Sequence, residues 1–420
     1  MKDKFPFAAF KSSKLKQAST LLAVNIIGIP IGIGTSVIVT NYLGPKEYGD
    51  YKFITSVFEF AMIIFTFGLY QASNRLLVIN SDEKTAKEIY GTSLIITAFL
   101  FVISSIAIAT YTLLDSNIES KGLTNTILFL VPFGWVFLLN RYFGTLLYAD
   151  NKIYLLSIIR LFPKIGFLVA CFFLIKFFTS TTNSILLVWA LFLFTQIIVY
   201  LFVLIKIKLS FKNFITRLRE IWHQLKIFGF NVYLGSVVSL GFAQLATLLI
   251  SYFGHDNSGV GFYTLAVTIT MPLTFIPNTI ATSHYKEFSN YNKIPVKLTR
   301  ITILLSIVSL FALVILISPF VKSFYGSAFS PVIQLSYFVA LGVLFHGFAD
   351  YFNRFLGANG QGKSLRNTSF IVGVSTLILS VILISMFDEK GAAIARLFSG
   401  LIYLITILYF YFNYIKKKSN

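Results

Sequence analysis

Charged residues are scarce in this chain. They make up 12% of its 420 residues, against roughly 25% in an ordinary soluble domain. Hydrophobic residues make up 56%, and a water-soluble fold has no interior large enough to bury that much apolar surface. The composition therefore excludes a soluble globular protein and predicts a protein embedded in a membrane.

Cysteine is almost absent, because Cys171 is the only one. A single thiol excludes an intramolecular disulfide and a metal site built from several cysteines. The zinc-binding motif HExxH and the nucleophile motif GxSxG are missing as well. A glycine-rich stretch, Asn359 to Lys363, falls in a short loop between apolar runs, where we interpret it as a flexible turn. The sequence thus predicts no catalytic residue, no metal ion and no cofactor.

Acidic residues are fewer than basic ones, 16 against 35, which gives a formal charge of +19. Such a balance is found in nucleic-acid-binding proteins, but membrane proteins also collect Lys and Arg in their cytoplasmic loops. In a chain this hydrophobic, the second explanation is the simpler one. We therefore expect the charge to mark membrane topology, with no nucleic acid as partner.

Apolar runs of about 20 residues, long enough for a helix to cross the hydrocarbon core, recur along the whole chain. The first six predicted spans lie near residues 18–40, 53–78, 91–113, 124–147, 154–177 and 184–205. The second six lie near residues 227–252, 262–284, 301–321, 331–353, 367–387 and 391–414. The predicted fold is an all-α integral membrane protein of about twelve transmembrane helices.

Lys and Arg are concentrated in alternate loops, beginning with Lys2 and Lys4 before the first span. The same side collects Lys84, Lys87, Lys152, the basic run from Lys206 to Lys226, Lys286, Lys293, Lys297, Arg300, Arg354, Lys363, Arg366 and Lys416 to Lys418. Because cytoplasmic loops carry the excess of Lys and Arg, both termini are expected in the cytoplasm.

Residues 206–226 form the longest cytoplasmic loop and separate an N-terminal half, 1–205, from a C-terminal half, 227–420. Apolar residues such as Phe214, Leu218 and Trp222 recur there at helical spacing, with basic residues on the other faces. This pattern predicts an amphipathic helix in the membrane interface. The alternative is a packing strap between the halves.

The two halves resemble each other in sequence. The loop YLGPKEYGDY (42–51) after the first span recurs as YFGHDNSGVGFY (252–263) after the seventh. A second echo pairs Asn140-Arg141-Tyr142-Phe143 with Asn353-Arg354-Phe355-Leu356. Two echoes in the same order indicate an internal duplication. Corresponding spans then run in the same direction, an arrangement that commonly encloses a central substrate path and operates by alternating access.

The stretch YLGPKEYGDYKFITSVFEFAMIIFTFGLYQASNRLL resembles the polysaccharide transporter branch of the multidrug/oligosaccharidyl-lipid/polysaccharide (MOP) exporter superfamily. Within that branch it is most similar to O-antigen flippases of the Wzx type. The resemblance implies a MATE-like fold of two parallel six-helix bundles. It also implies a flippase that moves undecaprenyl diphosphate-linked oligosaccharide to the outer leaflet of a bacterial inner membrane. Membrane lipids, a polysaccharide polymerase and the chain-length machinery are the other partners that such a role implies.

Charged side chains inside a span are costly, so they are functional candidates by default. Lys164 lies about ten residues into the fifth predicted span, and Arg160 precedes it by one helical turn on the same face. We expect this pair to form a cationic step on the wall of a cavity and to bind an anionic substrate. The alternative is that both cations pair with buried acids.

Three further arginines are weaker candidates for substrate binding. Arg75 and Arg141 lie near the cytoplasmic ends of their predicted spans, where a long side chain also reaches the headgroups. Arg396 lies near the outer end of the last span, which breaks the inside bias of the positive charges. We expect it to contact substrate at the exit side.

Glu59 and Asp350 are the acidic candidates, and we expect them to couple transport to H⁺ or Na⁺ because burial raises a carboxyl pKa. Thr66, Tyr70 and Ser73 continue the Glu59 stripe on what is expected to be one helix. Arg354 follows Asp350 by one turn, so a local ion pair is the simpler explanation there.

Two other functions stay open at this point. A multidrug exporter of the same superfamily would need a lumen that binds organic cations, which the cationic fifth span disfavours. A membrane-embedded polysaccharide polymerase would resemble enzymes with a large external loop, whereas the external loops expected here are short.

Overall fold

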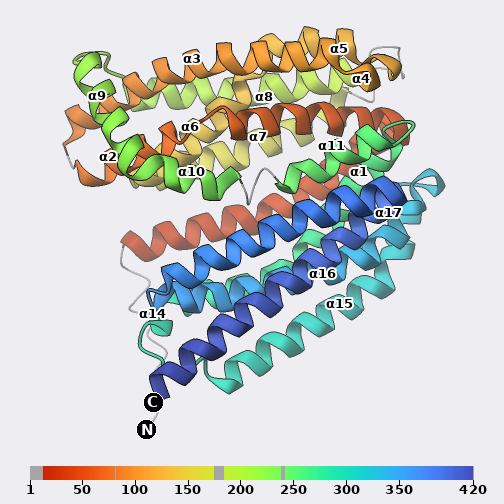
Figure 1. Ribbon diagram of the computed structural model, residues 1–420. Helices are drawn as coiled ribbons and strands as arrows, with labels where there is room; N and C mark the ends of the chain where they lie inside the picture. The colour runs from red at the N-terminus through yellow and green to blue at the C-terminus, as the bar shows by residue number, and fades with distance from the viewer. Residues whose placement is uncertain (1–12, 81, 175–183, 238–241, 420) are drawn as a thin grey trace. The chain divides into compact units, whose positions relative to one another are not determined.

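The computed structural model describes residues 13–80, 82–174, 184–237 and 242–419. The regular structure in these ranges is helical throughout (Figure 1). Residues 175–177 of the predicted fifth span and 238–241 of the seventh lie outside the described residues, as do Lys2 and Lys4.

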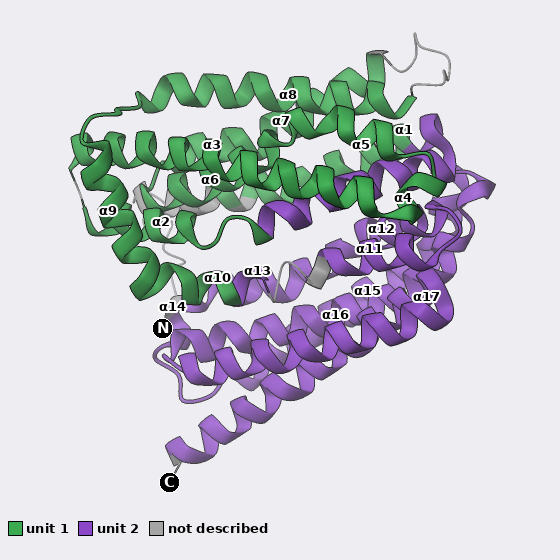
Figure 2. Ribbon diagram, turned by 45° about the horizontal axis from the view of Figure 1, so that its top comes forward, with its two compact units in different colours: residues 1–39, 64–234 green, residues 40–63, 235–420 purple. Residues whose placement is uncertain are grey.

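The chain forms two compact units (Figure 2). Unit 1 comprises residues 1–39 and 64–234, and unit 2 comprises residues 40–63 and 235–420. The first long helix, α1 (Ser13–Ile64), therefore contributes to both. The sequence-based boundaries of the halves, 1–205, 206–226 and 227–420, stay a prediction.

In the described residues, unit 1 holds the first part of α1 and nine further α-helices. These are α2 (Leu69–Ile79), α3 (Glu83–Leu114), α4 (Ser116–Ser120), α5 (Thr124–Leu130), α6 (Trp135–Ala149), α7 (Ile153–Leu174), α8 (Ser184–Ile207), α9 (Phe214–Gln224) and α10 (Phe230–Ser236). Short η segments connect some of them, η2 (Val131–Phe133) between α5 and α6 and the π-helix η3 (Leu225–Gly229) between α9 and α10.

Unit 2 holds residues 40–63 of α1 and the helices from α11 onward. These are α11 (Phe242–Phe253), α12 (Ser258–Thr270), η5 (Met271–Thr274), α13 (Phe275–Ser283), α14 (Tyr285–Phe288), α15 (Val296–Phe324), η6 (Ser327–Phe329), α16 (Pro331–Ala358) and α17 (Gly362–Ser419). Its core is aromatic, because Phe288, Tyr351, Phe355 and Tyr411 pack together from α14, α16 and α17.

The described residues contain eight helices long and apolar enough to cross a membrane, and the bent pair Thr124–Phe133 and Trp135–Ala149 makes a ninth. Two of the eight, 42 and 57 residues long, have about twice the length of one span. They break at Gly44 (φ 73°) and at Asp388 (φ 50°). Each of these two helices counts as two spans, and α10 and α11 both lie in the seventh predicted span. The described helices therefore confirm an architecture of about twelve spans.

One predicted span is interrupted. The sequence pattern predicts a single helix over residues 53–78, but α1 ends at Ile64 and α2 begins at Leu69. Phe67 (φ 46°) and Gly68 (φ 83°) are both left-handed there, a backbone conformation that an α-helix cannot continue through. Glu59 therefore lies on a different helix from Tyr70 and Ser73, and the expected polar stripe is not one helical face.

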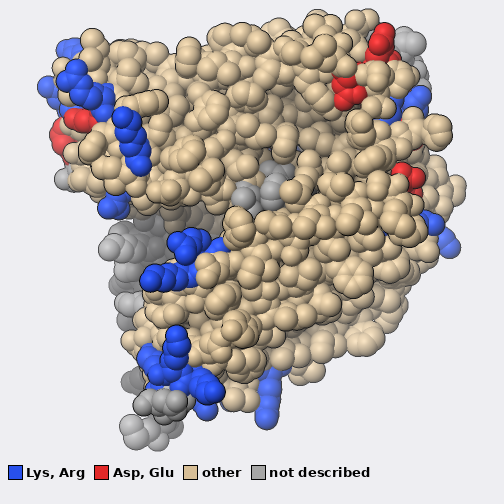
Figure 3. All heavy atoms as spheres, in the orientation of Figure 1, with Lys and Arg blue, Asp and Glu red and all other residues tan. Residues whose placement is uncertain are grey.

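The outer surfaces of the long helices are apolar. Only 17% of the most apolar window of α15 is buried inside the protein. On the face that Figure 3 displays, the flanks of the helices in each unit carry almost no charge, and Lys and Arg gather near helix ends. An exposed apolar flank with charged ends is what contact with the hydrocarbon core and the headgroups requires.

Candidate functional site in the membrane helices

The two cations of the fifth predicted span lie together on α7 in unit 1. Arg160 and Lys164 are one turn apart, and α7 continues through Pro163 between them. Lys164 lies eleven residues after Ile153, about 17 Å along the helix, too deep for easy access to the headgroups. The Lys164 ammonium lies close to Gly28 of α1, because a Cβ added to Gly28 would lie 3.3 Å from the Lys164 Nζ. The glycine leaves the space that this ammonium occupies.

Neither cation has a carboxylate partner within the described ranges, where the ion pairs involve other residues. The alternative that Arg160 and Lys164 pair with buried acids is therefore wrong for this part of the chain. Both side chains are exposed, and Arg160 lies near enough to act electrostatically on Lys164. Two like charges on an apolar helix repel each other, and an anion bound beside both of them would offset this repulsion.

Arg75 and Arg141 occupy different surroundings in unit 1. Arg75 on α2 is exposed, and its guanidinium carbon lies 5.6 Å from the ring centre of Phe228 in a cation–π contact. Arg141 on α6 is half-buried and acts electrostatically on Tyr70, whose hydroxyl donates to Thr97 at 3.0 Å. Their substrate-binding role stays a prediction.

In unit 2, Glu59 on α1 accepts a short hydrogen bond from the Gln244 amide on α11. Both side chains are partly buried. This hydrogen bond joins α1 to α11 within unit 2. The predicted coupling role of Glu59 is compatible with this contact, which the sequence did not reveal.

Asp350 on α16 accepts a hydrogen bond of 2.9 Å from Tyr403 on α17, and Tyr403 in turn accepts one of 2.9 Å from Asn353. The His346 ring packs edge-on against the same tyrosine with centroids 4.7 Å apart. The structure therefore places the carboxylate in a polar cluster between two helices, a cluster that we call the α16–α17 cluster (His346, Asp350, Asn353, Tyr403).

Arg354 does not form the expected ion pair with Asp350 among the described residues, because Tyr403 supplies the hydrogen bond instead. The Nε atoms of Arg354 and Arg396 are both buried without a hydrogen-bond partner. Both guanidinium groups nevertheless act electrostatically on Asp350. The structure thus places Arg396 close to Asp350. Arg396 was expected at the exit side, and Asp350 was expected to couple transport to ions.

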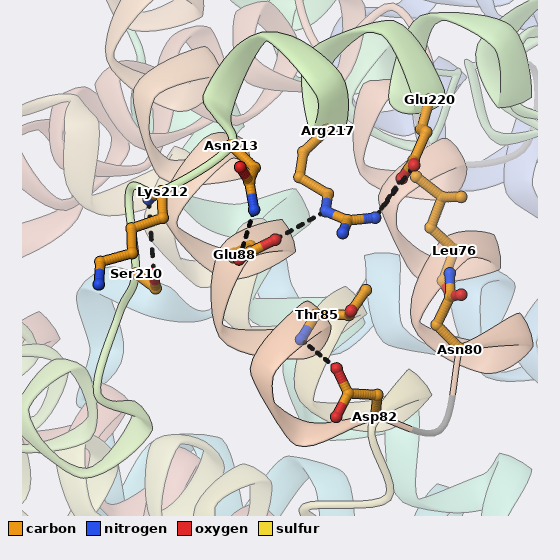
Figure 4. Close-up of polar contacts among 10 residues, drawn as sticks. All are labelled: Leu76, Asn80, Asp82, Thr85, Glu88, Ser210, Lys212, Asn213, Arg217 and Glu220. Carbon is orange, nitrogen blue, oxygen red and sulfur yellow. Dashed lines mark hydrogen bonds and ion pairs between the residues drawn. The ribbon is translucent and has the colours of Figure 1, made fainter.

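A buried carboxylate that the sequence did not single out fixes the linker helix. Glu88 on α3 is 1% exposed, and its two oxygens accept from the Arg217 Nε at 2.9 Å and the Asn213 amide at 3.0 Å (Figure 4). Arg217 also contacts Glu220 at 2.7 Å. We call this contact the α9 clamp (Glu88, Asn213, Arg217). Within the predicted linker, residues 214–224 form the helix α9, and the clamp fastens α9 to α3 within unit 1.

The start of α3 beside the clamp is capped by its own sequence. The Asp82 carboxylate accepts from the Thr85 amide at 2.9 Å (Figure 4), and this hydrogen bond lowers the pKa of Asp82. The preceding loop also contacts α3, since the Ser210 amide donates to the Lys87 carbonyl at 3.1 Å. The cap at Asp82 thus holds the start of α3, and the backbone hydrogen bond from Ser210 holds the loop before α9 against it.

Replacing Glu88 with glutamine is expected to destabilise the α9 clamp by about 2 kcal/mol, because a charged hydrogen bond to a buried acceptor is lost. Hydrogen exchange of the α9 amides should accelerate. Glu83→Gln on the same helix is the matched control, since Glu83 pairs with Lys87 at 2.7 Å but is 80% exposed, and such pairs contribute little. Equal effects of the two changes would contradict the clamp.

The two repeated loops meet in unit 2 through their glycines. A Cβ added to Gly49 would collide with the Asn257 carbonyl, and one added to Gly261 would lie 2.9 Å from the Pro45 carbonyl. Aligning Gly49 with Gly261 also aligns Pro45 with Asn257, so the contact is reciprocal. The Asn257 amide further donates to Asp50 at 2.7 Å. A reciprocal contact between equivalent residues is the signature of a pseudo-two-fold axis and supports the duplication.

The glycine-rich loop of unit 2 matches a known motif that the sequence-based interpretation did not include. Residues Gly357 to Ser364 read GANGQGKS and match the phosphate-binding pattern GxxxxGK[ST], which the sequence interpretation as a flexible turn overlooked. That motif requires a preceding strand, whereas here the pattern connects α16 directly to α17. Asn359 is tied into this turn by accepting from Tyr414 at 2.8 Å. The described structure therefore gives the pattern the role of a turn.

The sequence was compared with models of protein families and with functionally curated proteins. A family model described as "Polysaccharide biosynthesis protein" matches residues 15–289. A comparison with functionally curated proteins gives no match.

Among solved structures, the chain is similar to the Lipid II flippase MurJ in an inward closed conformation, with a TM-score of 0.73, 19% identity, and coverage of 92% of this chain and 86% of that one. It is also similar to an inward-facing MATE multidrug resistance transporter of the MOP superfamily, with a TM-score of 0.69, 15% identity, and coverage of 94% and 96%. A third similarity is to the MATE multidrug transporter DinF-BH, with a TM-score of 0.64, 14% identity, and coverage of 98% of both chains.

At these identities the structural likeness establishes the fold, and it confirms the MATE-like architecture expected from the sequence. The family match covers more than half of the chain and confirms the resemblance to the polysaccharide transporter branch. This chain belongs to the family of polysaccharide biosynthesis proteins and has the fold of the MOP superfamily.

Proposed function

We propose that this chain is a flippase for an anionic lipid-linked oligosaccharide: a polyprenyl diphosphate, such as undecaprenyl diphosphate, that carries an O-antigen or a related surface polysaccharide unit. The headgroup crosses from the cytoplasmic to the outer leaflet of a bacterial inner membrane by alternating access. The observation that carries the proposal is the pair Arg160 and Lys164, two neighbouring cations on a membrane helix without a carboxylate partner in the described ranges.

The chemistry of such a substrate fits these two side chains. Its diphosphate and sugars need a polar path, whereas its long apolar tail stays in the lipid. Arg160 binds phosphate oxygens through its planar fork of donors, and Lys164 neutralises them as a point charge. We include Arg75 and Arg141 of unit 1 and Arg396 of unit 2 as further anion contacts. The translocated unit then passes to a polysaccharide polymerase and its chain-length machinery.

A multidrug exporter is the second candidate, because the likeness to MATE transporters extends over nearly the whole chain. Such a transporter would carry organic cations, and unpaired cations on α7 would repel them. The sign of the charge on α7 therefore favours an anionic substrate.

Purified protein in lipid vesicles separates these candidates. A polyprenyl diphosphate oligosaccharide with a fluorescent sugar is added to both leaflets, and a membrane-impermeant quencher reports how fast the inner pool reaches the outside. We expect the protein to accelerate this movement over empty vesicles and to leave an organic cation dye where it is. Dye transport without headgroup movement would support the exporter.

We further propose that Glu59 and Asp350 couple the cycle to H⁺ or Na⁺. The same vesicles, with an imposed pH or sodium gradient, should then translocate the headgroup faster. Asp350→Asn is expected to remove the response to the gradient while keeping the rate measured without one, and Glu59→Gln is tested alongside it. A wild-type rate that ignores both gradients would end the coupling proposal and leave the flippase intact.

A further inference from the structure

An open groove lies between α9 and α3 in unit 1, with a volume of about 620 Å³. Ile95 and Phe99 form its wall on α3, and Ile215, Leu218 and Trp222 form the facing wall on α9. The groove is thus built from one face of the linker helix and one face of a membrane-spanning helix.

The walls of this groove are apolar and unusually exposed. The exposed fractions are 65% for Phe99, 70% for Ile215 and 53% for Trp222. The groove is also preformed, because the α9 clamp through Glu88 and Arg217 holds α9 against α3. A fixed apolar groove of this size favours an apolar occupant.

The rim of the groove is positively charged. Arg219 lines it and has no hydrogen bond or ion pair in the described part of the chain, in contrast to Arg217, which Glu88 and Glu220 neutralise. Lys226 adds a second cation, with Nζ 5.9 Å from the Trp222 ring centre. An occupant that satisfies both features has an apolar chain and an anionic head.

We infer that this groove binds an anionic phospholipid of the leaflet in which α9 lies, with the phosphate at Arg219 and one acyl chain along Ile95 and Phe99. The dimensions agree: Phe99 lies eleven residues beyond Glu88 on α3, about 17 Å along the helix, and one leaflet of a roughly 30 Å core has a similar depth. The inference requires only that the chain is in a membrane, and so it is independent of the proposed substrate.

Fluorescence of Trp222 tests the site, because this side chain lines the groove. The full-length protein is placed in phosphatidylcholine vesicles that contain brominated phosphatidylglycerol or, at the same fraction, brominated phosphatidylcholine. The fluorescence that Trp222→Phe removes is the part that Trp222 emits, and the quenching of this part is compared between the two lipids. We expect the anionic lipid to be preferred at Trp222, and we expect Arg219→Gln to lower that preference about fivefold, the effect of one cation near a headgroup.

Lys212→Gln is the matched control, since Lys212 is an exposed cation just before α9 that does not line the groove. It should leave the preference unchanged. An equal loss in Lys212→Gln and Arg219→Gln would mean diffuse attraction and would overturn the site. Displacement of the brominated phosphatidylglycerol by one equivalent of a polyprenyl phosphate would assign the groove to the tail of a polyprenyl lipid and would also overturn the inference. Unchanged hydrogen exchange of α9 in Arg219→Gln verifies that the helix still docks.

Discussion

Replacing Arg160 and Lys164 together with glutamine is expected to lower the rate of headgroup translocation at least about a hundredfold. Each charged hydrogen bond to a phosphate is worth roughly 1.5–3 kcal/mol, and 1.36 kcal/mol corresponds to a factor of ten in rate. The pair lies on α7 without a carboxylate partner in the described residues, so its removal leaves no buried acid uncompensated. The rate is measured in the vesicle assay with the fluorescent polyprenyl diphosphate.

Three variants make this result interpretable. Lys164→Arg keeps the charge beside Gly28 and should retain most of the rate, whereas Arg160→Lys loses the planar fork and should fall between wild type and the double variant. Arg300→Gln is the matched control, because Arg300 is an exposed cation near the start of α15. A double variant that translocates at the wild-type rate would remove α7 from the substrate path.

Gly49→Ala and Gly261→Ala are each expected to destabilise the protein by about 3 kcal/mol, the upper end of the cost of overpacking. The added methyl group meets a backbone carbonyl in both cases, that of Asn257 and that of Pro45. Backbone cannot yield as the far end of a flexible side chain does, so the two repeated loops must separate. Thermal unfolding in detergent measures the loss.

Gly144→Ala is the control for this pair, because Gly144 is helical and an added Cβ there meets nothing within 4 Å. It should be neutral or stabilising by up to about 1 kcal/mol, since alanine favours the helix. Equal stability of all three variants would show that the reciprocal contact between the repeated loops contributes nothing.

The helices could largely be predicted from the sequence, because a span in lipid must be about 20 apolar residues long and such runs are easy to recognise. The breaks within the helices were harder to predict. Gly44 lies in a motif that marks a turn, but the interruption at Phe67 and Gly68 has only one glycine as a signal. Asp388, left-handed inside α17, lies where the polar stretch between two predicted spans is only three residues long.

The candidate site could be predicted where its residues are neighbours in the sequence. Arg160 and Lys164 share a face because they are four residues apart, and periodicity reveals this directly. Contacts between distant segments gave no such signal. Glu88 meets Arg217 at a separation of 129 residues, and Asp350 meets Tyr403 at a separation of 53. Only the tertiary fold shows that Tyr403, and not Arg354, is the partner of Asp350.

The central claim, translocation of a lipid-linked oligosaccharide, is tested most directly in cells depleted of this protein, by measuring the leaflet in which that lipid accumulates. The proposed function predicts accumulation with the sugars facing the cytoplasm, protected from reagents that reach only the outer leaflet. Sugars that still reach the outer leaflet at the normal rate would contradict it. A single unpolymerised unit on the cell surface would indicate a polymerase instead.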